Sequence, residues 1–138
     1  MRKLFLDTDV ILDLLLDRPP FSADTARLFK YAITKKVNLF TSPVCIANIH
    51  YIISKIENKG RADAEIKRVL KQVRINDIGQ TVIDDAVASN FSDFEDSIQN
   101  FCAIRDKHTI LITRNTRDYR ESRLSILTPA EYLASIQS

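Results

Sequence analysis

Residues 4–21 read LFLDTDVILDLLLDRPPF, and the fold class can be inferred outward from this stretch. The apolar run at 4–6 predicts a short buried strand. Residues 10–16 then carry an apolar face interrupted by Asp13, which is typical of a short amphipathic helix. The sequence DRPP at 17–20 ends this helix, because proline cannot continue one. A strand followed at once by a helix is the repeating unit of α/β proteins.

The rest of the chain continues this alternation of short apolar strands and amphipathic helices. Further strands are predicted at 37–40, 74–78, 109–113 and 125–127. Helices are predicted at 22–36 with Ser22 as N-cap, from Ser42 and Pro43 to near Gly60, at 61–73, 81–90 and 92–107, and after Thr128 and Pro129. We therefore expect one α/β domain over residues 1–138, built on a parallel sheet.

Composition excludes several classes of function. The 138 residues carry a formal charge of +2, with 45% hydrophobic and 28% charged residues, the balance of a soluble globular protein. There are only two glycines, so the chain has no Gly-rich loop that could cradle a phosphate. Phosphate chemistry would therefore need side chains, a metal ion or helix termini. Cys45 and Cys102 lack a zinc-ligand spacing, and we expect both to be small core residues.

The N-terminal segment does not have the pattern of a targeting sequence. Its basic start and apolar run are broken by Asp7 and Asp9 long before the apolar region of a signal peptide would be complete. No stretch approaches the roughly 18 uncharged apolar residues that a membrane span needs. We therefore expect a cytoplasmic protein without a membrane partner.

Acidic and amide side chains follow the predicted strands at two places. Asp7, Thr8 and Asp9 come directly after the first strand, and TRNTRD at 113–118 follows the most apolar one. A third acidic segment, DFED at 93–96, begins the helix that leads into that strand. Active sites of open parallel sheets lie beyond the carboxyl ends of the strands, so we expect these side chains to meet.

A divalent cation would stabilise such a cluster of carboxylates. Like charges repel and raise each other's pKa, and a bound cation removes that cost. Oxygen ligands from Asp and Asn suit Mg²⁺ or Mn²⁺, which also bind phosphate and activate water. The pattern therefore favours metal-dependent phosphodiester chemistry.

Several of these acids also have a purely structural interpretation. Asp9 can be a turn or helix cap, and Asp93 can cap its helix and complement the helix dipole. Asp13 and Asp17 are interpreted as solvated or helix-end residues.

The histidines and arginines are interpreted in the same way. His50 and His108 have no evident Ser or Cys nucleophile beside them, which favours structural roles. Arginines recur at every third position from 114 to 123, and a solvated face is as good an explanation as a phosphate-contacting edge. Arg114 and Arg117 are the candidate RNA contacts among them.

The sequence resembles the PIN-domain family of small metal-dependent ribonucleases, which includes VapC-type toxins. The resemblance covers nearly the whole chain and rests on residues 4–21 together with DFEDSIQNFCAIRDKHTILITRNTRDY at 93–119. It implies a three-layer α/β/α fold with a central parallel sheet of four to five short strands. It also implies an endoribonuclease that cuts RNA with a metal-activated water and acts as the toxin of a type II toxin–antitoxin pair. A cognate antitoxin protein and a homodimer are the assemblies it implies.

The resemblance implies roles for individual residues. Asp7 would be the first metal-binding carboxylate, Asp96 the third, and Asn115 would occupy a fourth position that the family fills with Asp or Asn. The remaining assignments are Asp118 as an assisting catalytic acid, Thr8, Asp9 and Thr113 as supports of the site, and Asp93 as an extra metal-binding acid.

The second acid of the family pattern is missing from this chain. The family places Glu on the helix after the second strand, where this sequence has Asn48. A neutral amide can still coordinate an ion or position water, but it lowers the negative charge of the site. Either Asp93 supplies the missing charge or metal binding is weak.

Two other functions remain open on the residues alone. With Asn48 in place of Glu, the chain can be a PIN-like module that binds RNA or protein without cutting. The same acids would also serve a metal-dependent phosphatase or DNA nuclease, because carboxylates and a metal do not distinguish RNA from DNA. The preference for RNA comes only from the resemblance.

Overall fold

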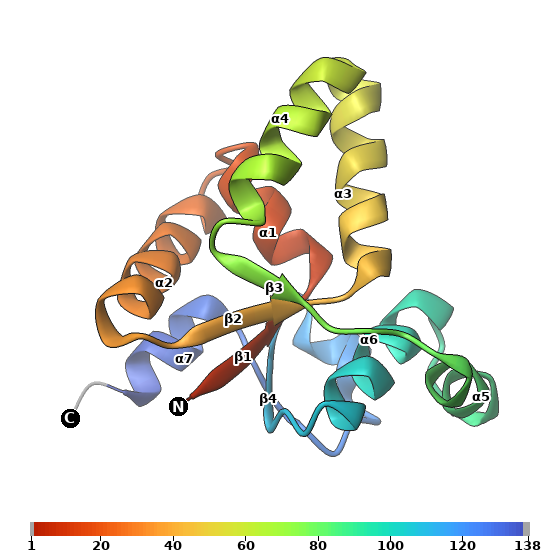
Figure 1. The fold of residues 1–138 in the computed structure, drawn as a ribbon. Coiled ribbons are helices and arrows are strands. Elements are labelled where there is room, and N and C mark those ends of the chain that lie inside the picture. Colours follow the sequence, from red (N-terminus) through yellow and green to blue (C-terminus); the bar gives the residue numbers. More distant parts are fainter. Residues whose placement is uncertain (1, 137–138) are drawn as a thin grey trace.

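The chain folds around a five-stranded parallel sheet with helices on both faces (Figure 1). The computed structural model describes residues 2–136. In spatial order the strands are β3 (Val73–Ile75), β2 (Asn38–Thr41), β1 (Lys3–Leu6), β4 (Ile110–Ile112) and β5 (Ser125–Leu127). The helices are α1 (Thr8–Leu15), α2 (Phe21–Lys35), α3 (Pro43–Ile56), α4 (Lys59–Val69), α5 (Gln80–Ala88), α6 (Phe94–Arg105), the short 3-10 helix η1 (Thr116–Tyr119) and α7 (Pro129–Ser135). The predicted α/β/α architecture with a parallel sheet is confirmed.

Side chains of the central strand alternate between two hydrophobic clusters. Leu4 and Leu6 point into the cluster formed with α1 to α4 and α7, whereas Phe5 points into the cluster formed with α5 and α6. This alternation follows from the two-residue period of a strand. All three residues are fully buried, which explains why β1 is apolar at successive positions. Figure 1 shows α1 to α4 on one side of the sheet and α5 and α6 on the other.

The order of the strands reverses beside β1. The chain proceeds outward from β1 to β2 and β3, and then returns to the other side of β1 to form β4 and β5. Such a reversal leaves a crevice outside the carboxyl ends of the two strands that flank it. The first acidic residue of the chain, Asp7, lies there, directly after β1, and its backbone N–H donates to the carbonyl of Ile112 at 2.9 Å.

Helix caps account for three helix starts that the sequence predicts. The Ser42 hydroxyl accepts from the N–H of Cys45 and begins α3, with Pro43 in the first turn. Thr128 and Glu131 form a reciprocal capping box at α7. The carboxylate of Asp93 caps α6.

Three predictions of local structure are wrong, and one short element was not predicted. Ser22 is not an N-cap, because α2 begins at Phe21 after Pro20 and the Ser22 side chain is buried within the helix. Gly60 does not end α3, because the side chain of Asn58 caps α4 and places Gly60 in its first turn. The helix predicted to reach Val73 ends at Val69, and Val73 instead begins β3. The turn η1 was not expected.

Asp13 is also not a solvated residue. Its residue surface is 1% exposed, and its carboxylate forms ion pairs with Arg18 and Arg114. The sequence pattern places Asp13 on the polar side of a short helix, but that side faces two arginines instead of water.

Three other residues given structural roles lie in the core, whereas His50 is partly exposed and contacts the Asp63 carboxylate at 2.7 Å. Cys45 and Cys102 are free and buried, as predicted. His108 packs edge-on against Phe5 and Phe40 and contacts the Asn76 side chain at 2.8 Å. Over residues 2–136, no helix is both long enough and apolar enough to cross a membrane.

Candidate active site

A cavity of about 480 Å³ lies beyond the carboxyl ends of β1 and β4. It is the place where the reversal of strand order predicts a ligand site. Its lining contains five acids, two asparagines and two arginines: Asp7, Asp9, Glu95, Asp96, Asp118, Asn48, Asn115, Arg18 and Arg114. The remaining lining residues are Thr8, Leu12, Tyr51, Ile52 and Gln99.

Asp7 occupies the floor of this cavity and is held by two hydrogen bonds. Its carboxylate accepts from the N–H of Thr8 at 2.7 Å, which caps α1, and from the hydroxyl of Thr113 at 2.9 Å. Burial raises the pKa of Asp7 to about 6, and the negative charge of Asp96 adds to the rise. The side chain is thus fixed in place and strained electrostatically when ionised.

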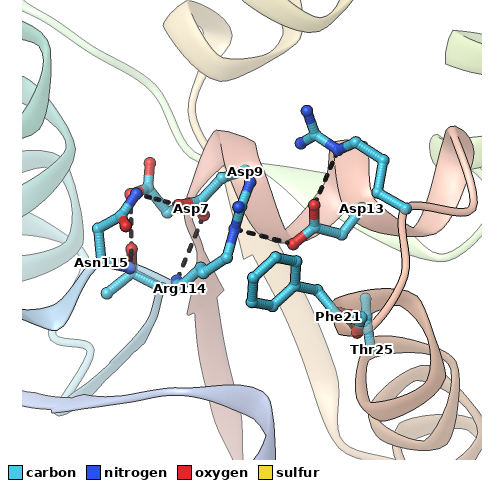
Figure 2. A network of polar contacts seen from close by, with 9 residues as sticks. Asp7, Asp9, Asp13, Phe21, Thr25, Arg114 and Asn115 are labelled. Carbon is cyan, nitrogen blue, oxygen red and sulfur yellow. Dashed lines mark hydrogen bonds and ion pairs between the residues drawn. The ribbon is translucent and has the colours of Figure 1, made fainter.

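Asp9 lies two residues further on, in the first turn of α1. Its carboxylate accepts from the Asn115 amide at 2.9 Å and from the N–H of Arg114 at 3.4 Å (Figure 2). These bonds tie the segment after β4 to the segment after β1. Burial, followed by the negative charge of Asp7, raises the pKa of Asp9 to about 7.

Asp96 approaches the cavity from the first turn of α6. The phenol of Tyr119 donates to its carboxylate at 3.4 Å. Burial raises the pKa of Asp96 to about 7, and the charges of Asp93 and Asp118 are the next largest causes. Two aspartates that follow β1 and one from α6 thus repel one another in one cavity.

Most of the residues predicted for the site are brought together. Those that line the cavity are Asp7, Thr8, Asp9, Asn48, Asp96, Arg114, Asn115 and Asp118. Thr113 lies just beneath it, buried, and donates to Asp7.

Two predicted residues lie outside the cavity lining. Asp93 accepts from the N–H of Asp96 at 2.9 Å and so acts as a helix cap, which is its structural alternative. Arg117 lies beside a smaller hollow that it shares with Phe91 and Glu121. Asp93 therefore influences the cavity through its charge on Asp96 and not as a lining residue.

Sequence reasoning missed Glu95, which lines the cavity next to the position where the family pattern lacks its acid. The Asn48 amide donates to the Glu95 carboxylate at 2.9 Å. The adjacent acids at 95 and 96 were the available signal, since two successive residues at a helix start can both reach the same opening. Arg18 was missed for a different reason, because its place in the DRPP segment suggested only the end of a helix.

The donor set suits a hard divalent cation. Carboxylate and amide oxygens are the ligands that Mg²⁺ and Mn²⁺ prefer, and crowded aspartates with raised pKa values are stabilised by a dication. Within residues 2–136, no group of three or more His, Cys, Asp or Glu side chains lies close enough to hold an ion by itself. An ion bound here would therefore have few protein ligands and would have to keep several waters, as Mg²⁺ commonly does.

Comparison with known proteins gives a consistent picture. The family model described as PIN domain matches residues 3–117. Ribonuclease VapC1 of Aquifex aeolicus (strain VF5) is 26% identical over 135 residues, covering 94% of this chain and 92% of that protein. DNA-bound VapBC from Salmonella typhimurium has a chain with a TM-score of 0.73 at 14% identity, covering 94% of this chain and 99% of that one. A chain of a toxin–antitoxin complex from Klebsiella pneumoniae has a TM-score of 0.65 at 21% identity, covering 91% and 97%.

Proposed function

This chain belongs to the PIN domain family, and from that premise we propose that it is a metal-dependent endoribonuclease acting as the toxin of a toxin–antitoxin pair. The observation that carries the proposal is the cavity in which Asp7, Asp9 and Asp96 meet and raise one another's pKa. Proteins retain such repulsion chiefly where it serves a site. The related ribonuclease supports RNA as the substrate.

Asp7, Asp96 and Asn115 would hold the Mg²⁺ or Mn²⁺ ion, with Asp118 close by. A bound dication at this site would acidify a water molecule and stabilise the charge that develops on the phosphate. The Asn115 amide N–H₂ donates to Asp9, so its carbonyl oxygen remains available as a ligand. Asp9 thereby orients Asn115, and Thr113 orients Asp7 in the same way.

Glu95 would supply the negative charge that Asn48 lacks. The hydrogen bond between the two side chains keeps the Glu95 carboxylate at the cavity, where a glutamate at position 48 would otherwise act. Hydrolysis with departure of the 3′ oxygen of the strand would leave a 3′ hydroxyl and a 5′ phosphate. RNA, a cognate antitoxin protein and a second copy of the chain are the partners we propose.

Metal binding to the native acids can be tested without any substrate. A cation that binds the folded state raises the melting temperature by linkage. We expect Mn²⁺ to raise the melting temperature of the wild type, and Asp96→Asn to abolish the rise. Glu95→Gln should require roughly tenfold more Mn²⁺ for the same rise.

Asp85→Asn is the matched control, because Asp85 is exposed on α5 and does not line the cavity. It should respond to Mn²⁺ as the wild type does. An equal rise for wild type and Asp96→Asn, or no rise at millimolar Mn²⁺, would show that these acids do not hold the ion.

Asn48 favours one alternative function, a PIN-like module that binds RNA or protein without cutting. A neutral side chain at this position leaves the site one carboxylate short of the family pattern. One observation separates the two functions. A binding module would bind RNA but would not cleave it in the presence of Mn²⁺ or Mg²⁺.

A further inference from the structure

The buried carboxylate of Asp13 is shared by two arginines from distant parts of the chain. Arg18 Nε donates to one carboxylate oxygen at 2.9 Å, and Arg114 Nε lies 3.2 Å from the other (Figure 2). The backbone N–H of Arg18 also donates to the Asp13 carbonyl at 3.0 Å. Asp13 therefore joins the loop after α1 to the segment after β4.

Both arginines approach Asp13 through Nε, and this geometry leaves their outer nitrogens unused. Within residues 2–136, the terminal Nη atoms of Arg18 and Arg114 have no hydrogen-bond partner. Their side chains are 38% and 28% exposed, whereas that of Asp13 is 2% exposed. Arg18 Nε is thus hydrogen-bonded to Asp13, whereas Arg114 Nε is buried beside the carboxylate as an ion pair without a hydrogen bond. Among the described residues, the outer nitrogens of both guanidinium groups are free.

The orientation of Arg114 is further restrained by an aromatic ring. Its guanidinium carbon lies 4.2 Å from the centroid of Phe21, within the range of a cation–π contact. Phe21 is the first residue of α2, and its carbonyl accepts from the Thr25 hydroxyl at 3.3 Å. A planar guanidinium that lies over a ring and is ion-paired through Nε loses little further entropy when it binds a ligand.

Both arginines line the same cavity as the aspartates. One carboxylate shared by two guanidinium groups leaves one positive charge that Asp13 does not neutralise, although the neighbouring carboxylate of Asp9 also attracts Arg114. A structural ion pair for Asp13 would need only one arginine. The second positive charge and the free outer edges suit an anion that offers two acceptor oxygens, and phosphate oxygens pair with arginine in this way.

We propose that Arg18 and Arg114 bind phosphates of the RNA strand beside the cut bond, and that Asp13 is a positioning residue that holds both guanidinium groups for this contact. The proposal rests on the proposed function, since it takes RNA as the substrate. It also explains how a polyanion enters a cavity floored by aspartates: the arginines offset the repulsion along the path of the backbone.

The test is the binding of a fluorescently labelled single-stranded RNA in EDTA, where cleavage does not occur, measured by anisotropy over a range of salt concentrations. Arg18→Gln and Arg114→Gln should each raise Kd roughly tenfold. Each should also reduce the salt slope of log K by about 0.7, the value for one phosphate contact on a single strand. Arg27→Gln is the control, because Arg27 is an exposed arginine outside this cavity. Equal effects at all three positions would overturn the proposal.

The Asp13→Asn variant tests whether the Kd for RNA rises or falls when this carboxylate is removed. Charge alone predicts that removing a carboxylate beside a polyanion tightens binding, whereas loss of positioning predicts that Kd rises severalfold. Tighter RNA binding by Asp13→Asn overturns the positioning role. If this variant does not fold by circular dichroism, Arg18→Lys and Arg114→Lys replace it: they keep the charge but lose the fork, and wild-type affinity for both would overturn the proposal.

The outcomes separate this proposal from the proposed function. If the arginine variants lose RNA affinity but the wild type does not cut with Mn²⁺, the phosphate contact stands and the nuclease function fails. If the wild type cuts and the arginine variants bind RNA normally, only the present proposal fails. Loss of affinity for a polyglutamate peptide with unchanged RNA affinity would assign the arginines to an acidic protein partner and overturn it.

Discussion

Asp7 has two roles at one position, because it caps α1 and carries a carboxylate into the cavity. The first role is met by any good cap, since Asn accepts an N–H as well as Asp does. The second role needs the negative charge, and ionisation of Asp7 is unfavourable in the folded protein. Burial and the charge of Asp96 together raise the pKa of Asp7 to about 6. Substitution by asparagine therefore separates stability from function.

In metal-free protein, the unfolding free energy should respond to pH through this group. Between pH 3.8, the ordinary pKa, and about 6, folded Asp7 holds a proton that the unfolded chain has released. Stability from this group is thus fully present below the unfolded pKa and is lost as pH rises through about 6. Relative to wild type, Asp7→Asn should gain about 1–3 kcal/mol between about pH 4 and pH 8.

Urea denaturation in EDTA at the two pH values measures this gain. Asp85→Asn serves again as the exposed control and should show a much smaller pH-dependent difference. An Asp7→Asn protein whose difference from wild type is the same at both pH values would show that the carboxylate is not strained in the native state.

Sequence motifs predict the metal-site residues of the cavity well. They do not predict the residues whose role depends on a contact with a distant part of the chain. Asp7, Asp96 and Asn115 follow from the PIN-like motifs and from their places at strand and helix ends. The burial of Asp13 could not be predicted, because its partner Arg114 lies at the other end of the sequence. Glu95 likewise gains its meaning only when α6 is packed against α3, where Asn48 lies.

Helices and strands are placed correctly where one local sequence pattern is strong. They are misplaced where two patterns fit the same residues. The apolar runs of β1 and β4 and the serine or threonine followed by proline before α3 and α7 are all in place. The end of α4 was misplaced because Val69 and Val73 are four residues apart and fit one helix face equally well. Tertiary pairing of Val73 with Leu39 of β2 decides that it belongs to a strand.

The capping box of α7 offers a test at this scale. Thr128 accepts from the N–H of Glu131 at 3.0 Å, and the Glu131 carboxylate accepts in return from the N–H of Thr128 at 2.9 Å. Tyr132, in the same short helix, is buried in the core. Thr128→Ala should lower the unfolding free energy by about 1 kcal/mol, measured by urea denaturation.

Thr34→Ala is the matched control, because Thr34 is exposed within α2. Its unfolding free energy should stay within about 0.5 kcal/mol of wild type. Equal losses for the two variants would mean that the cap does not stabilise α7.

For the whole molecule, the net charge of +2 conceals a strong separation of charge. Aspartates form the floor of the cavity, and arginines joined through Asp13 form part of its side. Composition predicted that phosphate chemistry would need side chains or a metal, but not where they would meet. The strand order, which reverses beside β1, determines that place, and it depends on pairing between strands that no local pattern encodes.

Metal-dependent cutting of RNA by the aspartate cavity is tested most directly by a cleavage assay with identified products. Purified protein is incubated with RNA and Mn²⁺ or Mg²⁺, and the ends of the fragments are determined by mass spectrometry. We expect fragments with 5′ phosphate and 3′ hydroxyl ends, none in EDTA, and rates reduced roughly 100-fold or more by Asp7→Asn and Asp96→Asn but not by Asp85→Asn. Cleavage that persists at the wild-type rate in EDTA or in Asp7→Asn would contradict the proposed function.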